Sequence, residues 1–172
     1  MSQIYYENWW WDEQYTPQRW VEILLPHIQH LKNKVIWLPF DTEDSHFVKV
    51  LRKEWFNIVN SHISEWKDFI TYEPEYFDCI ISNPPYKNKR IYWERALSFS
   101  KPFALLLPVN ILSDSMIWNT LMKDWRWLQL LIPDKRIRFY NAVTGVIWNQ
   151  PTFKACYFRV WIFREDIIFT KY

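Results

Sequence analysis

Short apolar segments alternate along this chain with segments whose apolar residues recur at helical spacing, and this alternation limits the possible folds more than any other feature. The apolar segments lie at residues 35–38, 56–59, 77–81, 103–107, 127–132, 155–163 and 167–170. Buried strands separated by amphipathic helices are typical of βαβ units. We therefore expect an α/β fold in which a mainly parallel sheet has helices on both faces. A single compact domain would span residues 1–172, with residues 1–14 as an N-terminal extension.

Four segments have the pattern of helices that would connect these strands. The first follows Thr16, which is suited to the N-cap, and Pro17, which is suited to the first turn. The second begins after Asp44 or Ser45, because both residue types are good N-caps. The sequence predicts the remaining helices over residues 90–99 and 115–124.

The most specific motif is Asn83-Pro84-Pro85-Tyr86, which directly follows the expected strand 77–81. Ligands bind beyond the carboxyl ends of the strands in open parallel sheets, so this is where a site is expected. The alternative interpretation is a stiff exit loop, in which Asn83 is a turn residue and Tyr86 packs beneath it.

The residue types of this motif suit the handling of a planar amino group. An Asn side-chain oxygen and a backbone carbonyl can each accept one proton of the amine, which turns the nitrogen lone pair toward an incoming methyl group. Proline has a fixed backbone and no N–H of its own, so the neighbouring carbonyls are held ready as acceptors. The ring of Tyr86 can stack on a base that has left its helix.

The order of the motifs resembles that of the S-adenosylmethionine-dependent methyltransferases that act on the exocyclic amine of adenine. The resemblance covers roughly residues 15–110 and implies a Rossmann-like methyltransferase fold. It implies a catalytic role for Asn83, Pro84, Pro85 and Tyr86. It also implies a set of cofactor-binding residues: Tyr15, Thr16 and Pro17 beside the methionine end, Pro39 and Asp41 in the loop after the first strand, and Asp68 and Phe69 at the adenine ring. The segment 103–108, followed by Asn110, resembles the strand and loop behind the catalytic motif.

Two features depart from the family pattern. The loop 39–44 contains no glycine, whereas the family uses glycines there so that the backbone can approach the cofactor. In place of the acidic residue that would hold the ribose hydroxyls stand Asn60, Ser61 and His62. Both a redesigned and a lost cofactor pocket are consistent with these residues. The acidic loop itself suits the positive methionine end, which Asp41 would face.

Two basic clusters are candidates for contact with a phosphate backbone. They consist of Lys87, Lys89 and Arg90 after the catalytic motif, and of Lys135, Arg136 and Arg138 farther along the chain. The alternative for each cluster is an ordinary solvated face. No separate target-recognition domain is evident, so specificity is expected to depend on a protein partner or on base flipping at exposed sites.

The composition excludes several other classes of protein. Cys79 and Cys156 are too few for a disulfide framework, and neither the cysteines nor the four histidines have the spacing of a metal site. The N-terminus lacks the basic start and apolar core of a signal peptide, and no segment is long enough to span a membrane. We expect a cytoplasmic protein without a metal.

The leading hypothesis is therefore methyl transfer from S-adenosylmethionine to adenine N6, in DNA rather than RNA. A second hypothesis keeps the site but methylates a glutamine amide of a protein, another planar NH₂ group. A third is a catalytically inert relative that binds nucleic acid or a host protein as a phage decoy or inhibitor. The missing glycines favour the third hypothesis, and the intact Asn83–Tyr86 motif opposes it. The chain also resembles short phage-borne adenine methyltransferases.

Overall fold

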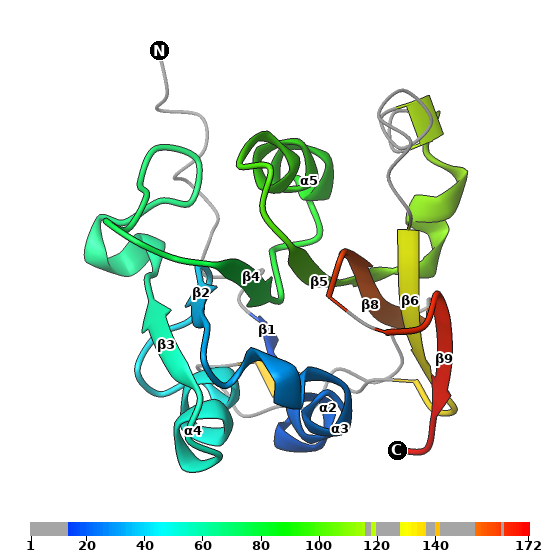
Figure 1. Cartoon of the computed structure of the whole chain (residues 1–172). Coiled ribbons are helices and arrows are strands. Elements are labelled where there is room, and N and C mark those ends of the chain that lie inside the picture. Colours follow the sequence, from blue (N-terminus) through cyan, green and yellow to red (C-terminus); the bar gives the residue numbers. More distant parts are fainter. Residues whose placement is uncertain (1–13, 116–117, 120–127, 137–139, 142–153, 163) are drawn as a thin grey trace.

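The computed structural model describes residues 14–115, 118–119, 128–136, 140–141, 154–162 and 164–172 (Figure 1). Within these residues, seven strands form one sheet in the order β3-β2-β4-β5-β8-β6-β9. Their bounds are β2 Val35–Leu38, β3 Asn57–Asn60, β4 Cys79–Ser82, β5 Phe103–Pro108, β6 Leu128–Pro133, β8 Ala155–Val160 and β9 Ile167–Thr170. Two short strands, β1 Gln14–Tyr15 and β7 Tyr140–Asn141, pair antiparallel with each other.

The sheet is mainly parallel, as the sequence predicts. β3, β2, β4 and β5 are neighbours in that order, and each adjacent pair is parallel. β8 runs antiparallel to both of its neighbours, β5 and β6, whereas β6 and β9 are parallel. Among the described strands of this sheet, only β8 is therefore reversed, and the other six end at the same edge.

Helices cover both faces of the sheet, which confirms the second part of the predicted architecture. Figure 1 shows α5 Lys89–Ser98 on one side, and α2 Gln18–Glu22, α3 Leu25–Ile28 and α4 His46–Lys53 on the other. Successive strand residues enter the two cores alternately, as the pleat of a strand requires. In β2, Ile36 and Leu38 pack with α2, α3 and α4, whereas Trp37 packs in the core that contains Trp93 of α5.

The helix that follows Thr16 differs from the prediction in two ways. Pro17 occupies the N-cap position of α2, so Thr16 is not the cap. The helical segment is also divided, because α2 ends at Glu22 and α3 begins at Leu25. Pro26 explains the division, since it has no N–H to donate and its ring would clash with the carbonyl four residues earlier.

The other boundaries differ by a few residues. β4 begins at Cys79 rather than at residue 77, and β8 ends at Val160 rather than at residue 163. α4 is capped by Ser45, whose hydroxyl accepts from Val48 N at 3.2 Å, so this residue rather than Asp44 is the N-cap. Most of the helix expected over 115–124 lies outside the described residues. Three short 3₁₀ helices complete the described chain: η2 Gln29–Leu31, η3 Ile63–Glu65 and η4 Val109–Ser113.

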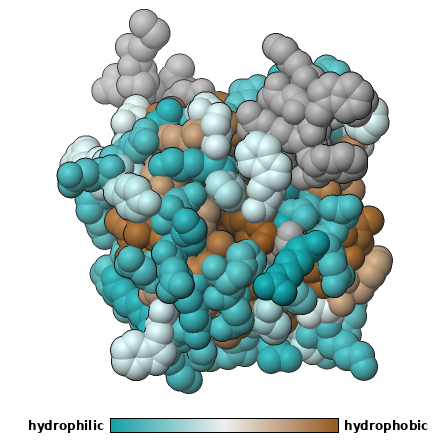
Figure 2. Space-filling view, viewed as in Figure 1, coloured by the Kyte–Doolittle hydropathy of each residue, from teal (hydrophilic) through white to brown (hydrophobic). Residues whose placement is uncertain are grey.

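Hydrophilic residues dominate the face of the molecule seen in Figure 2, and hydrophobic ones show through near its centre. In the part of the chain that the structure describes, every helix is too short or too polar to cross a membrane.

Candidate active site

The loops at the carboxyl ends of β2 and β4 meet at the point where the strand order reverses. From β2 the chain proceeds to β3 on one side and then returns to β4 on the other side of β2. Such a switch point opens a crevice for ligands, because the loops on either side of it lead away from each other. Residues 39–45 follow β2, and the Asn83–Tyr86 motif follows β4. The fold thus brings the expected cofactor loop beside the expected catalytic motif.

A hydrogen bond between two buried side chains connects these loops. The Ser82 hydroxyl donates to Asp41 Oδ2, although the two residues are 41 positions apart in the sequence. Asp41 is 6% exposed and Ser82 is fully buried. The backbone of Asp41 is also fixed, because its N–H donates to Ser61 O at 3.2 Å and its carbonyl accepts from Asn60 Nδ2 at 3.2 Å. Asp41 is therefore held from the β3 side and from the β4 side at once.

Burial raises the pKa of the Asp41 carboxyl to about 6. Hydrogen bonds from Ser82 and Ser45 and the charge of His62 act in the opposite direction but do not offset the desolvation. Among the described residues, no lysine or arginine contributes to this pKa. A positively charged ligand beside the loop would supply the missing charge and favour the ionised carboxylate.

The pKa of Asp41 leads to a prediction about stability and pH. Because the pKa in the folded protein lies above the unfolded value, Asp41 favours folding most at low pH, and this contribution is lost as pH rises from about 4 through about 6. A difference of about two units between the folded and the unfolded pKa corresponds to about 3 kcal/mol in the free energy of unfolding. We expect the stability of Asp41→Asn, measured by urea unfolding, to gain about this much relative to wild type between pH 4 and pH 7. A constant difference across this range would contradict the raised pKa.

The loop 39–45 needs no glycine for its own conformation. The described residues other than glycine with positive φ are Trp55, Trp66, Ser100 and Trp161, none of which lies in the loop. Pro39 is buried, and the loop ends in the N-cap of α4, where Ser45 N donates to Thr42 O at 3.0 Å. The departure from the family pattern therefore concerns only how closely a ligand can approach the backbone.

Two buried oxygens at this place have no hydrogen-bond partner among the described residues. They are Thr42 Oγ1 in the loop after β2 and Asn83 Oδ1 at the end of β4. A buried acceptor without a partner costs about 1–3 kcal/mol, so such atoms are rare in folded proteins outside sites where a ligand supplies the partner. Each of the two loops thus presents one polar atom that a ligand would satisfy.

The rest of the catalytic motif packs into the protein. Pro84 is buried, and Pro85 and Tyr86 are half-buried. The side chain of Tyr86 packs against both hydrophobic cores. Burial raises the pKa of Tyr157, and the charges of Tyr86 and Asp41 raise it further, so Tyr157 lies within electrostatic reach of both side chains.

Tyr157 connects the site to α2. It is fully buried in β8, and its hydroxyl donates to Trp20 O at 2.7 Å. The N-terminal motif lies close by: Thr16 is buried, and its carbonyl lies 2.9 Å from His46 Nδ1 at the start of α4. Pro17 is half-buried, and Tyr15 pairs with Tyr140 through the backbone. The structure thus places Thr16 beside the start of α4, directly after the loop 39–45.

Asp68 and Phe69 lie in an irregular segment between β3 and β4. Asp68 is half-buried, and its Oδ1 accepts from Ile70 N at 3.0 Å. Phe69 is 1% exposed, and its ring lies 4.9 Å from that of Phe40 in the cofactor loop and 5.2 Å from that of Trp37. Phe69 therefore packs against the loop 39–45 through Phe40. A position beside a cofactor ring stays a prediction.

The basic residues follow strands that end at the same edge of the sheet. Lys87 and Arg90 are exposed and Lys89 is half-buried after β4, and Arg90 forms an ion pair with Glu94 at 3.6 Å. Lys135 and Arg136 are exposed after β6, whereas Arg138 lies outside the described residues. β6 is three positions from β4 in the sheet, which corresponds to about 14 Å. Both described clusters are therefore on the side of the catalytic motif.

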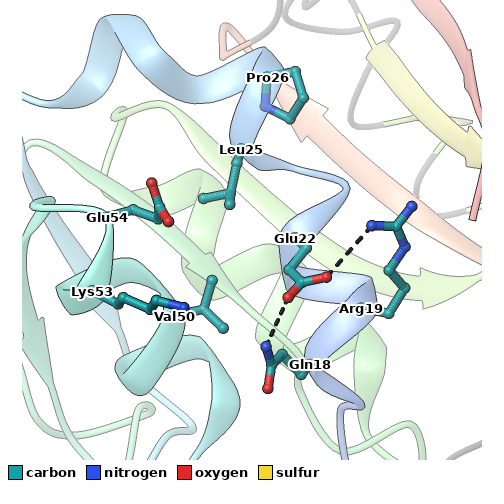
Figure 3. A pocket seen from close by; sticks show the side chains of 8 residues that line it. All are labelled: Gln18, Arg19, Glu22, Leu25, Pro26, Val50, Lys53 and Glu54. Carbon is teal, nitrogen blue, oxygen red and sulfur yellow. Dashed lines mark hydrogen bonds and ion pairs between the residues drawn. The ribbon is translucent and has the colours of Figure 1, made fainter.

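A separate pocket of about 350 Å³ lies between α2, α3 and α4 (Figure 3). Polar and apolar side chains both line it, and Glu22 accepts a hydrogen bond from Gln18 at 2.7 Å and forms an ion pair with Arg19 at 3.5 Å. None of the predicted site residues lines it. Burial raises the pKa of both cysteine thiols to about 12 and leaves them protonated at neutral pH.

Three residues of the site were not expected from the sequence: Thr42, Ser82 and Tyr157. Ser82 could have been predicted from the sequence, because it is a polar residue at the end of an apolar strand, directly before Asn83. No local pattern distinguishes Tyr157, which reaches the site through the sheet order alone.

Two solved structures have folds similar to this one. A proposed RNA methyltransferase from Pyrococcus horikoshii is 10% identical with a TM-score of 0.54, and the match covers 88% of this chain and 87% of that protein. The methyltransferase subunit of a type I restriction-modification system from Streptococcus thermophilus is 11% identical with a TM-score of 0.53. That match covers 92% of this chain and 47% of the subunit, so the chain spans about half the subunit's length. No protein-family model matches the sequence, and no curated protein matches it significantly. The chain therefore has the Rossmann-like fold of methyltransferases.

Proposed function

We propose that this protein transfers a methyl group from S-adenosylmethionine to adenine N6 in DNA. The observation that carries the proposal is the buried oxygen of Asn83, which has no hydrogen-bond partner among the described residues and lies at the carboxyl end of β4. A side-chain acceptor in this state suits a ligand that brings an N–H donor, and the adenine amine is such a donor.

The residues of the motif have distinct roles in this proposal. Asn83 Oδ1 accepts one proton of the amine, and the Pro84 carbonyl accepts the other. The two acceptors hold the nitrogen and turn its lone pair outward. Tyr86 stacks on the base, and Pro85 keeps the backbone of the motif in one conformation. The chain's own task is thus to position and polarise the amine.

The residues around β2 fit the cofactor. S-adenosylmethionine supplies an activated methyl group on a positively charged sulfur. Asp41 offers a negative charge that lacks a lysine or arginine neighbour among the described residues, and Thr42 offers an oxygen without a partner. We assign to the same site the remaining predicted cofactor residues, which are Tyr15, Thr16, Pro17, Pro39, Asp68 and Phe69.

The substrate class rests on the placement of charge. Lys87, Arg90, Lys135 and Arg136 are exposed at the edge that carries the motif. A phosphate backbone laid across this edge would reach both clusters. The Streptococcus thermophilus protein, named as part of a restriction-modification system, is compatible with a DNA substrate and with a protein partner that supplies target recognition.

Cofactor binding is the first prediction of this proposal. Because side chains rather than a glycine backbone must make the contacts, we expect weak binding, with a dissociation constant on the order of tens of micromolar. Asp41→Ala and Asp68→Ala should each weaken it about tenfold. Calorimetric titration or quenching of the intrinsic tryptophan fluorescence measures the affinity.

Asp44→Ala is the matched control for this experiment. Asp44 belongs to the same acidic loop, but its side chain is 85% exposed and is paired with Lys49. Its removal should leave the affinity within about twofold of wild type. Wild-type protein that shows no heat, no quenching and no thermal shift at millimolar cofactor would refute the proposed activity and favour an inert relative.

The substrate is tested with cofactor that carries a labelled methyl group. We expect label in adenine-containing DNA and a product that migrates as N6-methyladenine after hydrolysis. Transfer to RNA alone, or to a glutamine-containing protein alone, would show that DNA is not the substrate. The proposed binding of the NH₂ group by Asn83 and the Pro84 carbonyl would still stand. Cofactor binding without transfer to any of the three would contradict the catalytic role of the motif.

A further inference from the structure

The hydrogen bond between Ser82 and Asp41 directly connects the strand before the proposed catalytic motif with the proposed cofactor loop. Ser82 is the last residue of β4, and Asn83 follows it directly. Asn83 Oδ1 has no partner among the described residues, so this oxygen is not fixed by a bond of its own. Its position depends on the backbone, and the nearest side-chain anchor of that backbone is the Ser82 hydroxyl.

Asp41 is a firm anchor because other elements hold it. Its backbone is bonded to Ser61 O and to Asn60 Nδ2, both from the end of β3. Ser61 Oγ in turn accepts from Trp37 Nε1 at 2.9 Å in the buried core. A continuous series of bonds therefore runs from the core through the cofactor loop to the residue beside Asn83.

We propose that the Ser82–Asp41 hydrogen bond is a positioning device that sets the orientation of Asn83 according to the charge of the Asp41 carboxyl in the cofactor loop. This inference rests on the proposed function. Ser82 is a positioning residue in it, because it acts through Asn83 and does not touch the substrate.

The charge of Asp41 controls the bond for a simple chemical reason. The ionised carboxylate only accepts, so the Ser82 hydroxyl donates to it and the bond is charge-assisted. A protonated carboxyl carries a proton of its own and no longer needs this donor. The other groups that act on Asp41 are Ser45 at the cap of α4 and His62 after β3. The Asp41 charge in turn raises the pKa of Tyr157 in β8.

Three variants test the device in the methyl transfer reaction. Ser82→Ala should lower kcat by roughly tenfold to a hundredfold, as expected for a displaced catalytic group, and change the cofactor affinity by less than about threefold. Because the Ser82 hydroxyl lowers the pKa of Asp41, its loss should also move the acid limb of the pH–rate profile upward by about one unit. Ser82→Thr retains the hydroxyl and should restore most of the rate and the wild-type limb. Asp41→Asn should remove the limb, and a limb that persists in this variant would belong to another group and overturn the inference.

A measurement on the free protein separates this inference from the proposed function. In ¹⁵N-labelled wild-type protein, the backbone and side-chain amide signals of Asn83 should shift with pH around the pKa of Asp41, which is about 6. The shift should vanish in Asp41→Asn and move to higher pH in Ser82→Ala. Asn83 signals that do not respond to pH, or that respond equally in Asp41→Asn, would overturn the inference even if methyl transfer is demonstrated. A response of this kind in a protein that binds no cofactor would support the device and refute only the proposed function.

Discussion

Asn83→Ala should abolish nearly all methyl transfer while leaving the protein at least as stable as wild type. Removal of one hydrogen-bond partner that acts in a transition state typically costs a hundredfold or more in kcat. Asn83 Oδ1 makes no hydrogen bond to any described residue, so its removal breaks no bond of this oxygen within that part of the chain. We expect kcat to fall at least a hundredfold and the cofactor affinity to change by less than about twofold. The free energy of unfolding should stay at the wild-type value or rise by up to about 3 kcal/mol, because a buried acceptor without a partner is removed. Single-turnover transfer of a labelled methyl group and urea unfolding measure these quantities.

Asn88→Ala is the control for this experiment. Asn88 lies five residues farther along and precedes α5, but its side chain forms no cap bond. This variant should keep the wild-type rate. If Asn83→Ala lost cofactor binding and activity equally, or unfolded at much lower urea concentration, the motif would be a structural loop and the assigned role of Asn83 would be wrong.

Trp37→Ala should cause the largest loss of stability among single substitutions in the sheet. Trp37 is fully buried, and its ring lies 4.9 Å from Phe77, 5.2 Å from Phe69 and 5.6 Å from Phe99. Truncation of a buried aromatic residue leaves a cavity and costs about 3–5 kcal/mol. For a chain of this size, such a loss lowers the thermal midpoint by about 10 °C. Thermal unfolding followed by circular dichroism measures the effect.

Trp66→Ala is the comparison, because Trp66 is 93% exposed. Its φ of 60° is equally unfavourable for alanine, which also carries a Cβ, so the backbone contribution is unchanged. We expect a change of less than about 0.5 kcal/mol. Similar losses in the two variants would mean that the aromatic cluster around Trp37 is not the core that the structure indicates.

The sequence by itself determined the type and order of the main elements. Apolar segments that end at Pro39 or just before Asn83 are too short for helices and too hydrophobic for loops, so they had to be buried strands. Alternation with helical segments then required parallel pairing, and parallel pairing places the strand ends at one edge. For this reason the sequence alone predicts a site in the region around Asn83. The local boundaries were less well determined, as the division of the first helix at Pro26 shows.

Tertiary structure alone decided which side chains meet at that site. Asp41 and Ser82 bond because β2 and β4 are neighbours in the sheet, and nothing in either segment specifies the other. Tyr157 comes within electrostatic reach of Asp41 and Tyr86 because β8 inserts antiparallel beside β5. Phe69, expected at a cofactor ring, is buried because Trp37 and Phe40 pack around it. The hydrophobic periodicity of a segment indicates which of its residues face the core and which face solvent. Contacts between residues distant in the sequence depend instead on the strand order, which is determined by the packing of the whole chain.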